Sequence, residues 1–149
     1  MIYNINEIIK EINSIKDIVF ENENEHIYRY LDGYKIITDS DQEILCAIEN
    51  GQDCCEEWGY FWCNDNIKDF IGSKLLSIKI TDKALNNQIF DKNAPVFYEG
   101  GVMFVDFVTD KGNLQFVAYN EHNGYYGHEA IIKTSYPSKP FYLIHRQIL

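Results

Sequence analysis

The residues best suited to chemistry gather in one short segment, Gly51-Gln52-Asp53-Cys54-Cys55-Glu56-Glu57, where two thiols stand among three carboxylates. A cysteine attacks as a thiolate, which a nearby histidine, cation or helix N-terminus must stabilise. His122 or His128 could supply such a partner to Cys54 or Cys55 in the folded chain. The surrounding carboxylates destabilise the thiolate, because their negative charge repels it. A cysteine-dependent hydrolase therefore stays open as an alternative and is not the favoured interpretation.

The same segment has two further interpretations, a metal site and a structural turn. Zinc sites usually show Cys-x2–4-Cys pairs, whereas Cys54 and Cys55 are adjacent and Cys63 follows after seven residues. Adjacent side chains on a strand point to opposite faces, so one ion would rarely take both thiols. In the structural interpretation, one thiol packs in the core and Asp53 and Glu56 hold backbone amides. This interpretation is favoured, and we expect no metal and no cofactor.

A second cluster lies near residue 125. Asn123 and the following glycine are expected to form a turn, and Tyr125 and Tyr126 are then expected to face opposite sides of a strand. His128 is a candidate acid–base group because of its imidazole side chain, although a hydrogen-bonded structural role is commoner for a lone strand histidine. A pocket that joined these residues to the 52–56 segment would predict a small-ligand site.

Charge is the other functional signal. The chain has 149 residues and a formal charge of −10. Residues 1–75 carry six basic and sixteen acidic side chains, while residues 76–149 are balanced; residues 17–65 alone carry two basic and thirteen acidic side chains. Such a chain is a poor candidate for binding nucleic acid through its phosphates. It also lacks the basic face of a membrane-surface helix.

An acidic face can instead bind a basic protein. A fixed array of carboxylates substitutes for phosphates and steers association with a basic channel. We therefore expect the partner to be a host protein with a basic nucleic-acid-binding channel. The residues expected to contact it are Glu21, Glu23, Glu25, Asp39, Asp41 and Glu43.

Residues 4–18 are expected to form an amphipathic helix. Their isoleucines recur at three- and four-residue spacing, which places them on one helical face. Asn4 followed by Glu7 resembles a capping box and would begin the helix.

The remaining chain predicts short strands. Two strands should meet in a hairpin at Asp32-Gly33, and a short helix should occupy residues 67–71. Residues 82–100 show no period and predict a long loop. The other expected strands cover residues 42–49, 58–63, 74–81, 102–109, 113–119, 125–134 and 141–148. The expected class is α+β, with the N-terminal helix packed on a twisted, mostly antiparallel sheet and one further short helix, in a single domain over residues 1–149.

Location follows from what the N-terminus lacks. The first residues contain neither a basic region nor a continuous apolar stretch, so they do not predict a signal peptide. No apolar run approaches the length of a membrane span. We expect a protein of the host-cell cytoplasm, whose thiols remain reduced.

Three ordered motifs carry a resemblance to a known family. They are Gln52-Asp53-Cys54-Cys55-Glu56, Ile67–Ser73, and Phe104–Thr109 with Gly112 and then Asn123-Gly124-Tyr125-Tyr126. This order, over about residues 50–135, resembles the DUF7448-like family of small uncharacterised proteins from Gram-positive bacteria and their phages. Lys74 stands where that family often has proline, and the acidic strands before residue 50 lie largely outside the motifs.

The resemblance implies a phage or mobile-element setting. Together with the charge, it favours a non-enzymatic inhibitor of host defence, similar to an anti-CRISPR protein. Two alternatives stay open. One is a small-ligand binder or hydrolase built on the 52–56 and 122–128 clusters, and the other is a housekeeping domain of unknown partner whose acidic surface is simply solvated.

Overall fold

The computed structural model describes residues 2–22, 27–52, 55–97, 99–122, 127–137 and 139–149. In these residues the chain is nearly all β, and the expected α+β class is wrong. The strands are β1 Ile2–Asn22, β2 Ile27–Thr38, β3 Glu43–Glu49, β4 Glu57–Trp62, β5 Lys74–Thr81, β6 Gly100–Thr109, β7 Gly112–Glu121, β8 Glu129–Ser135 and β9 Tyr142–Ile148.

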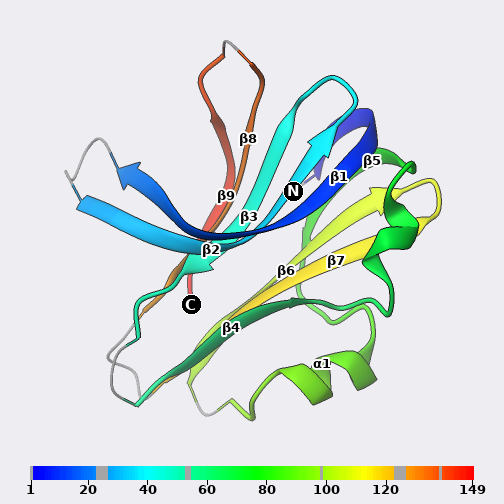
Figure 1. The fold of residues 1–149 in the computed structure, drawn as a ribbon. Coiled ribbons are helices and arrows are strands. Elements are labelled where there is room, and N and C mark those ends of the chain that lie inside the picture. The colour runs from blue at the N-terminus through cyan, green and yellow to red at the C-terminus, as the bar shows by residue number, and fades with distance from the viewer. Residues whose placement is uncertain (1, 23–26, 53–54, 98, 123–126, 138) are drawn as a thin grey trace.

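All the strands belong to one antiparallel sheet in the order β4-β7-β6-β5-β1-β2-β3-β8-β9. Figure 1 shows β1 curving between the two halves of this sheet, with β5, β6, β7 and β4 on one side and β2, β3, β8 and β9 on the other. The first part of β1, Ile2–Ile8, pairs with β5, and the part from Ile9 onward pairs with β2.

The N-terminal segment is therefore a strand and not the expected helix. Its pairing contains three irregularities, between Asn4 and Glu7, Ile9 and Glu11, and Ile15 and Ile18. Along a regular strand, every second side chain points to the same face of the sheet. An extra residue in a bulge shifts this alternation by one position, so apolar residues three apart point to the same face across a bulge.

Two residues in these irregular regions adopt left-handed backbone conformations. Asn6 has φ 65° and Asp17 has φ 53°. Asn and Asp tolerate this region better than most residues, because their short polar side chains can bond locally. The amide of Asp17 donates a hydrogen bond to Asp32 Oδ1 at 2.9 Å, which fixes the irregular region between Ile15 and Ile18.

The main core lies between the two halves of the sheet. It contains Ile36, Ile44 and Ile132 from one half and Phe107 and Phe116 from the other, all fully buried. Burying each such side chain stabilises the fold by about 1.5–3 kcal/mol. A second cluster, with Phe20, Leu31, Leu45, Ala47 and Ile131, lies on the opposite face of β2, β3 and β8.

The helical segments also differ from expectation. A 3-10 turn at Ile67–Phe70, capped by the Asn66 side chain, replaces the expected helix at 67–71. Within the expected loop at 82–100, α1 spans Asn87–Asn93, and the Asn86 side chain caps it by accepting from the amides of the second and third helical residues. Figure 1 shows α1 outside the sheet beside β4, where its apolar residues pack on a third cluster that includes Phe104 and Val117. Among the described residues, no helix is long and apolar enough to cross a membrane.

Contacts made by β9 and by Leu149 also hold the two halves of the sheet together. The β9 side chain of Gln147 donates to the carbonyl oxygen of Val102 in β6 at 3.3 Å. Asn120 in β7 donates to the carbonyl oxygen of Leu149 at 3.3 Å, and Tyr142 stacks on Tyr3 with ring centroids 5.7 Å apart. The last strand thus crosses the ends of strands in the other half.

Gly33 lies in the middle of β2 and not in the expected hairpin turn. It pairs with Ile15 on one side and Ala47 on the other. A Cβ at this position would overlap the carbonyl oxygen of Cys46 and lie 2.7 Å from the Cα of Ala47. Glycine is thus required by the close approach of β3.

We predict that Gly33→Ala lowers the free energy of unfolding by about 1–3 kcal/mol, because the added methyl group must displace the β3 backbone. Urea denaturation monitored by tryptophan fluorescence measures the change. Gly51→Ala is the matched control, since a Cβ there meets no atom within 4 Å. Equal stability of the two variants would contradict the proposed close approach.

Candidate functional site

The 52–56 segment connects β3 to β4, and the structure describes only part of it. Asp53 and Cys54 lie outside the described residues. Cys55 is exposed and has a left-handed backbone, with φ 67°. The side chain of Glu56 is fully buried, and its Oε1 lies 2.8 Å from Nε2 of His128. The two motifs singled out in the sequence are therefore joined at this pair.

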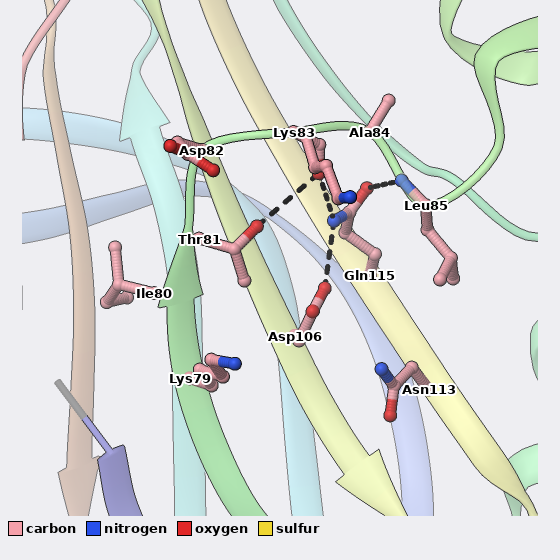
Figure 2. A pocket seen from close by; sticks show the side chains of 10 residues that line it. All are labelled: Lys79, Ile80, Thr81, Asp82, Lys83, Ala84, Leu85, Asp106, Asn113 and Gln115. Atoms are coloured by element: carbon pink, nitrogen blue, oxygen red, sulfur yellow. Dashed lines mark hydrogen bonds between the residues drawn. The ribbon is translucent and has the colours of Figure 1, made fainter.

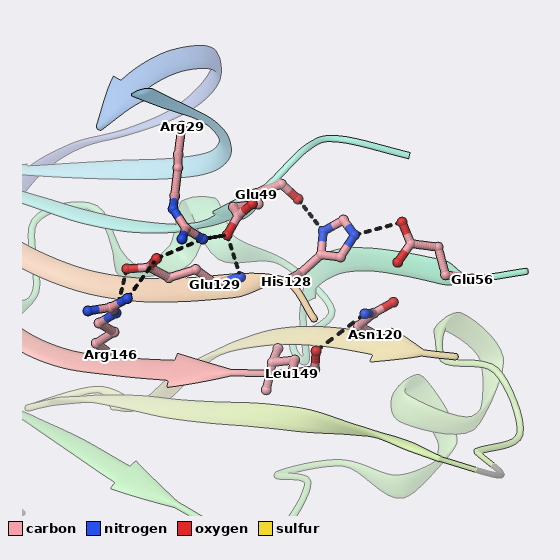
Figure 3. A network of polar contacts seen from close by, with 8 residues as sticks. All are labelled: Arg29, Glu49, Glu56, Asn120, His128, Glu129, Arg146 and Leu149. Carbon is pink, nitrogen blue, oxygen red and sulfur yellow. Dashed lines mark hydrogen bonds and ion pairs between the residues drawn. The ribbon is translucent and has the colours of Figure 1, made fainter. Parts of the chain in front are cut away.

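His128 is buried and uses both ring nitrogens, as Figure 3 shows. Nδ1 lies 2.8 Å from the carbonyl oxygen of Glu49, and Nε2 faces Glu56. Because a carbonyl oxygen only accepts, Nδ1 must carry a proton and donate it. The contact with Glu56 needs a second proton, held by the imidazole or by the carboxyl group. The ring of Trp58 stacks on the imidazole with centroids 5.6 Å apart. His128 therefore ties the 50s segment to β8, and this geometry gives it no free nitrogen for acid–base chemistry.

A larger charged network continues from this pair across four neighbouring strands (Figure 3). Glu129 in β8 is buried between two arginines. Nη1 of Arg29 in β2 lies 3.1 Å from its Oε2, and Nε of Arg146 in β9 lies 2.7 Å from its Oε1. Glu49 in β3 contacts Arg29 and accepts the amide of Glu129 at 2.9 Å. The Arg146–Oε1 contact is an ion pair and not a well-directed hydrogen bond.

This network explains charges that looked free in the sequence. Glu49 and Glu56 belong to the acidic 17–65 segment, but both point inward to partners from distant parts of the chain. Asp32 is likewise buried and accepts from Asn50 Nδ2 at 2.8 Å. Glu129 and Arg146 were not singled out in the sequence. Nothing in the sequence indicated that these two residues are paired inside the protein, since a charged residue on a short strand is usually exposed.

Two of the three described thiols are placed as structural groups. Cys46 and Cys63 are buried, and burial raises the pKa of the Cys46 thiol far above its ordinary value. The Sγ of Cys46 lies 3.6 Å from the carbonyl oxygen of Tyr34, and that of Cys63 lies 3.3 Å from that of Asn86. Cys46 and Cys63 form no disulfide, and no group of three His, Cys, Asp or Glu side chains among the described residues is placed to hold a metal ion.

The rest of the candidate pocket stays a prediction. Asn123, Tyr125 and Tyr126 lie outside the described residues, as do Asp53 and Cys54.

The predicted partner-binding residues separate into two groups. Glu23 and Glu25 lie outside the described residues, and for Glu21 only the backbone in β1 is described. Asp39, Asp41 and Glu43 gather where β2 turns into β3. Asp39 accepts the amide of Ile8 at 3.1 Å, so its carboxylate also holds β1 against this turn.

Two of these carboxylates line a hollow in the surface. It has a volume of about 410 Å³ and is bounded by Lys10, Glu11, Ile37, Asp41, Glu43, Ser135, Tyr136 and Pro137. We call this the acidic hollow. Lys10 Nζ lies 3.4 Å from Asp41 and Lys35 Nζ lies 3.6 Å from Glu43, with both acids well exposed. Exposed ion pairs of this kind add only about 0–1 kcal/mol to stability.

We predict that Glu129→Gln lowers the free energy of unfolding by about 2–3 kcal/mol, since it leaves two partly buried arginines without their shared carboxylate. Thermal and urea denaturation measure the loss. Glu57→Gln removes an equal charge from an exposed position on β4 and should change stability by less than about 0.5 kcal/mol. Equal effects of the two substitutions would show that the network contributes nothing beyond surface charge.

Comparison with known proteins gives a family without an activity. No curated protein and no solved structure matches the chain. The profile of a domain of unknown function (DUF7448) matches residues 5–132. The match begins within β1, so the acidic strands before residue 50 are part of the shared domain and do not lie outside it. The chain belongs to the DUF7448 family.

Proposed function

We propose that this protein is a non-enzymatic inhibitor of a host defence protein, encoded by a phage or mobile element, that binds a basic surface through its acidic face. The observation that supports this proposal is the acidic hollow, where Glu11, Asp41 and Glu43 surround one concavity. A lysine or arginine side chain of a partner would meet three carboxylates there. The class of partner we propose is a protein with a basic nucleic-acid channel, such as a CRISPR nuclease.

The proposed binding face consists of the carboxylates that remain at the surface. Asp32, Glu49 and Glu56 already bind groups within the protein, so we do not include them in the proposed binding face. Asp41 and Glu43 remain at the surface, where Lys10, the partner of Asp41, is exposed and Lys35, the partner of Glu43, is partly buried. A basic partner can therefore compete for these two surface carboxylates at little energetic cost, because ion pairs at the protein surface contribute little to stability.

The geometry gives less support to a hydrolase. A cysteine nucleophile needs a base with a free nitrogen, and both nitrogens of His128 are engaged by Glu49 and Glu56. The exposed thiol of Cys55 lies in a segment that is rich in carboxylates, which disfavours its thiolate.

We predict that the protein displaces fluorescent duplex DNA from a purified, guide-loaded CRISPR nuclease of a Gram-positive host. Binding should weaken steeply as salt is raised, since screening acts on exposed charges. The double variant Asp41→Lys, Glu43→Lys should lose at least roughly tenfold in affinity, because attraction becomes repulsion.

The matched control is Asp91→Lys with Glu99→Lys, which makes the same change of net charge at two exposed positions away from the hollow. Its affinity should stay near that of the unchanged protein. Binding that ignores salt and tolerates the Asp41 and Glu43 changes would overturn the electrostatic proposal. Failure to displace DNA from such nucleases would exclude them as the partner class.

A further inference from the structure

A larger hollow lies on the other half of the sheet. Its volume is about 670 Å³, and Figure 2 shows it on the outer face of β5, β6 and β7, beneath the 82–85 segment that leads to α1. This volume is in the range of small-molecule sites. Lys79, Asp106 and Gln115 form a row across its floor, because they are cross-strand neighbours on three adjacent strands.

Gln115 builds this hollow. It is buried, with 1% of its surface exposed, and both ends of its amide are bonded. Its Oε1 accepts the amide of Leu85 at 2.8 Å, while its Nε2 donates to the carbonyl oxygen of Lys83 at 3.1 Å and to Asp106 Oδ1 at 2.8 Å. One side chain thus fixes both the covering segment and the carboxylate on the floor (Figure 2).

Asp106 keeps one oxygen available. Among the described residues, its Oδ2 accepts no hydrogen bond, whereas Oδ1 is held by Gln115. Burial raises the pKa of Asp106, while the hydrogen bond from Gln115 and the positive charge of Lys79 act in the lowering direction. A half-buried carboxylate with one oriented, unfilled oxygen favours a cationic ligand group.

The charges around the hollow balance but are not paired with each other. Lys79 and Lys83 contribute two positive groups, and Asp82 and Asp106 contribute two negative ones. Within the described part of the chain, none of the four forms an ion pair within 4 Å. Separated charges of both signs complement a ligand that is neutral overall and carries both signs itself. Ala84 and the partly exposed Leu85 add an apolar wall.

We propose that this hollow binds a small zwitterion with an aliphatic tail, of the α-amino-acid class. The ammonium group would bind Asp106, the carboxylate would bind Lys79 and Lys83, and the tail would lie against Leu85. The hollow is on the half of the sheet away from the acidic hollow, so this proposal and the proposed function can fail separately.

The test uses L-leucine as the probe and amide NMR shifts of the full chain as the readout. Saturable shifts should appear at Lys79, Asp106 and Gln115, with a Kd of about 1 mM or tighter. Leucinamide, which lacks the carboxylate, and 4-methylpentanoate, which lacks the ammonium, should each bind at least roughly tenfold more weakly, as loss of one charge-assisted contact requires.

Asp106→Asn should weaken leucine binding by a similar factor, because it removes the charge and can still accept from Gln115. Asp91→Asn, in α1 and outside the hollow, is the matched control and should bind as the unchanged protein does. Absence of saturable shifts at about 10 mM leucine would overturn the proposal. Equal binding of leucinamide, or full binding by Asp106→Asn, would also overturn it.

Leucine binding should also depend on pH. The ammonium needs an ionised Asp106, so affinity should be full above the pKa of this carboxyl and fall as the pH drops through it. Since burial raises that pKa, the loss should begin at a higher pH than for an ordinary aspartate. An affinity that stays constant through this range would contradict a role for Asp106.

Discussion

The fold depends on one strand that serves two halves of a sheet. β1 pairs with β5 through its first residues and with β2 through the rest, and irregularities in its pairing let the sheet curve over its own core. The left-handed conformations of Asn6 and Asp17 lie in two of these regions. Without the change of direction, the isoleucines of β2 and β3 could not face the phenylalanines of β6 and β7.

The same bulges explain why the N-terminal segment reads as a helix. Ile9 and Ile12 face the main core across one irregularity, and Ile15 and Ile18 face the second cluster across another, so a spacing of three arises without a helix. The abundance of isoleucine was the contrary signal, because β-branched residues favour strands. By contrast, the hairpin of β6 and β7 was predictable, since Asp110-Lys111-Gly112 provides a local turn signal.

The candidate site was less predictable because its contacts join distant residues. Sequence position placed Glu49 and Glu56 in an acidic segment, but their partners Arg29, Glu129 and His128 come from other strands. The residue types around 52–56 and at His128 did indicate a shared cluster, and the Glu56–His128 contact joins its described parts. Their chemistry could not be judged from residue type alone, since it depends on whether the fold leaves a ring nitrogen of His128 free, and both nitrogens are engaged.

The distinction between engaged and exposed carboxylates bears on what the negative charge does. A carboxylate that accepts backbone amides or lies between arginines stabilises the fold, and repulsion among such groups is offset inside the protein. Among the described residues, the ion-pair partners of Asp41 and Glu43 are Lys10 and Lys35. Such pairs at the surface add little stability, while the two carboxylates contribute to the repulsion of a chain with charge −10. Placing such groups around one hollow has no evident benefit to folding. Under the proposed function, these carboxylates bind a partner whose positive charge removes the repulsion on binding.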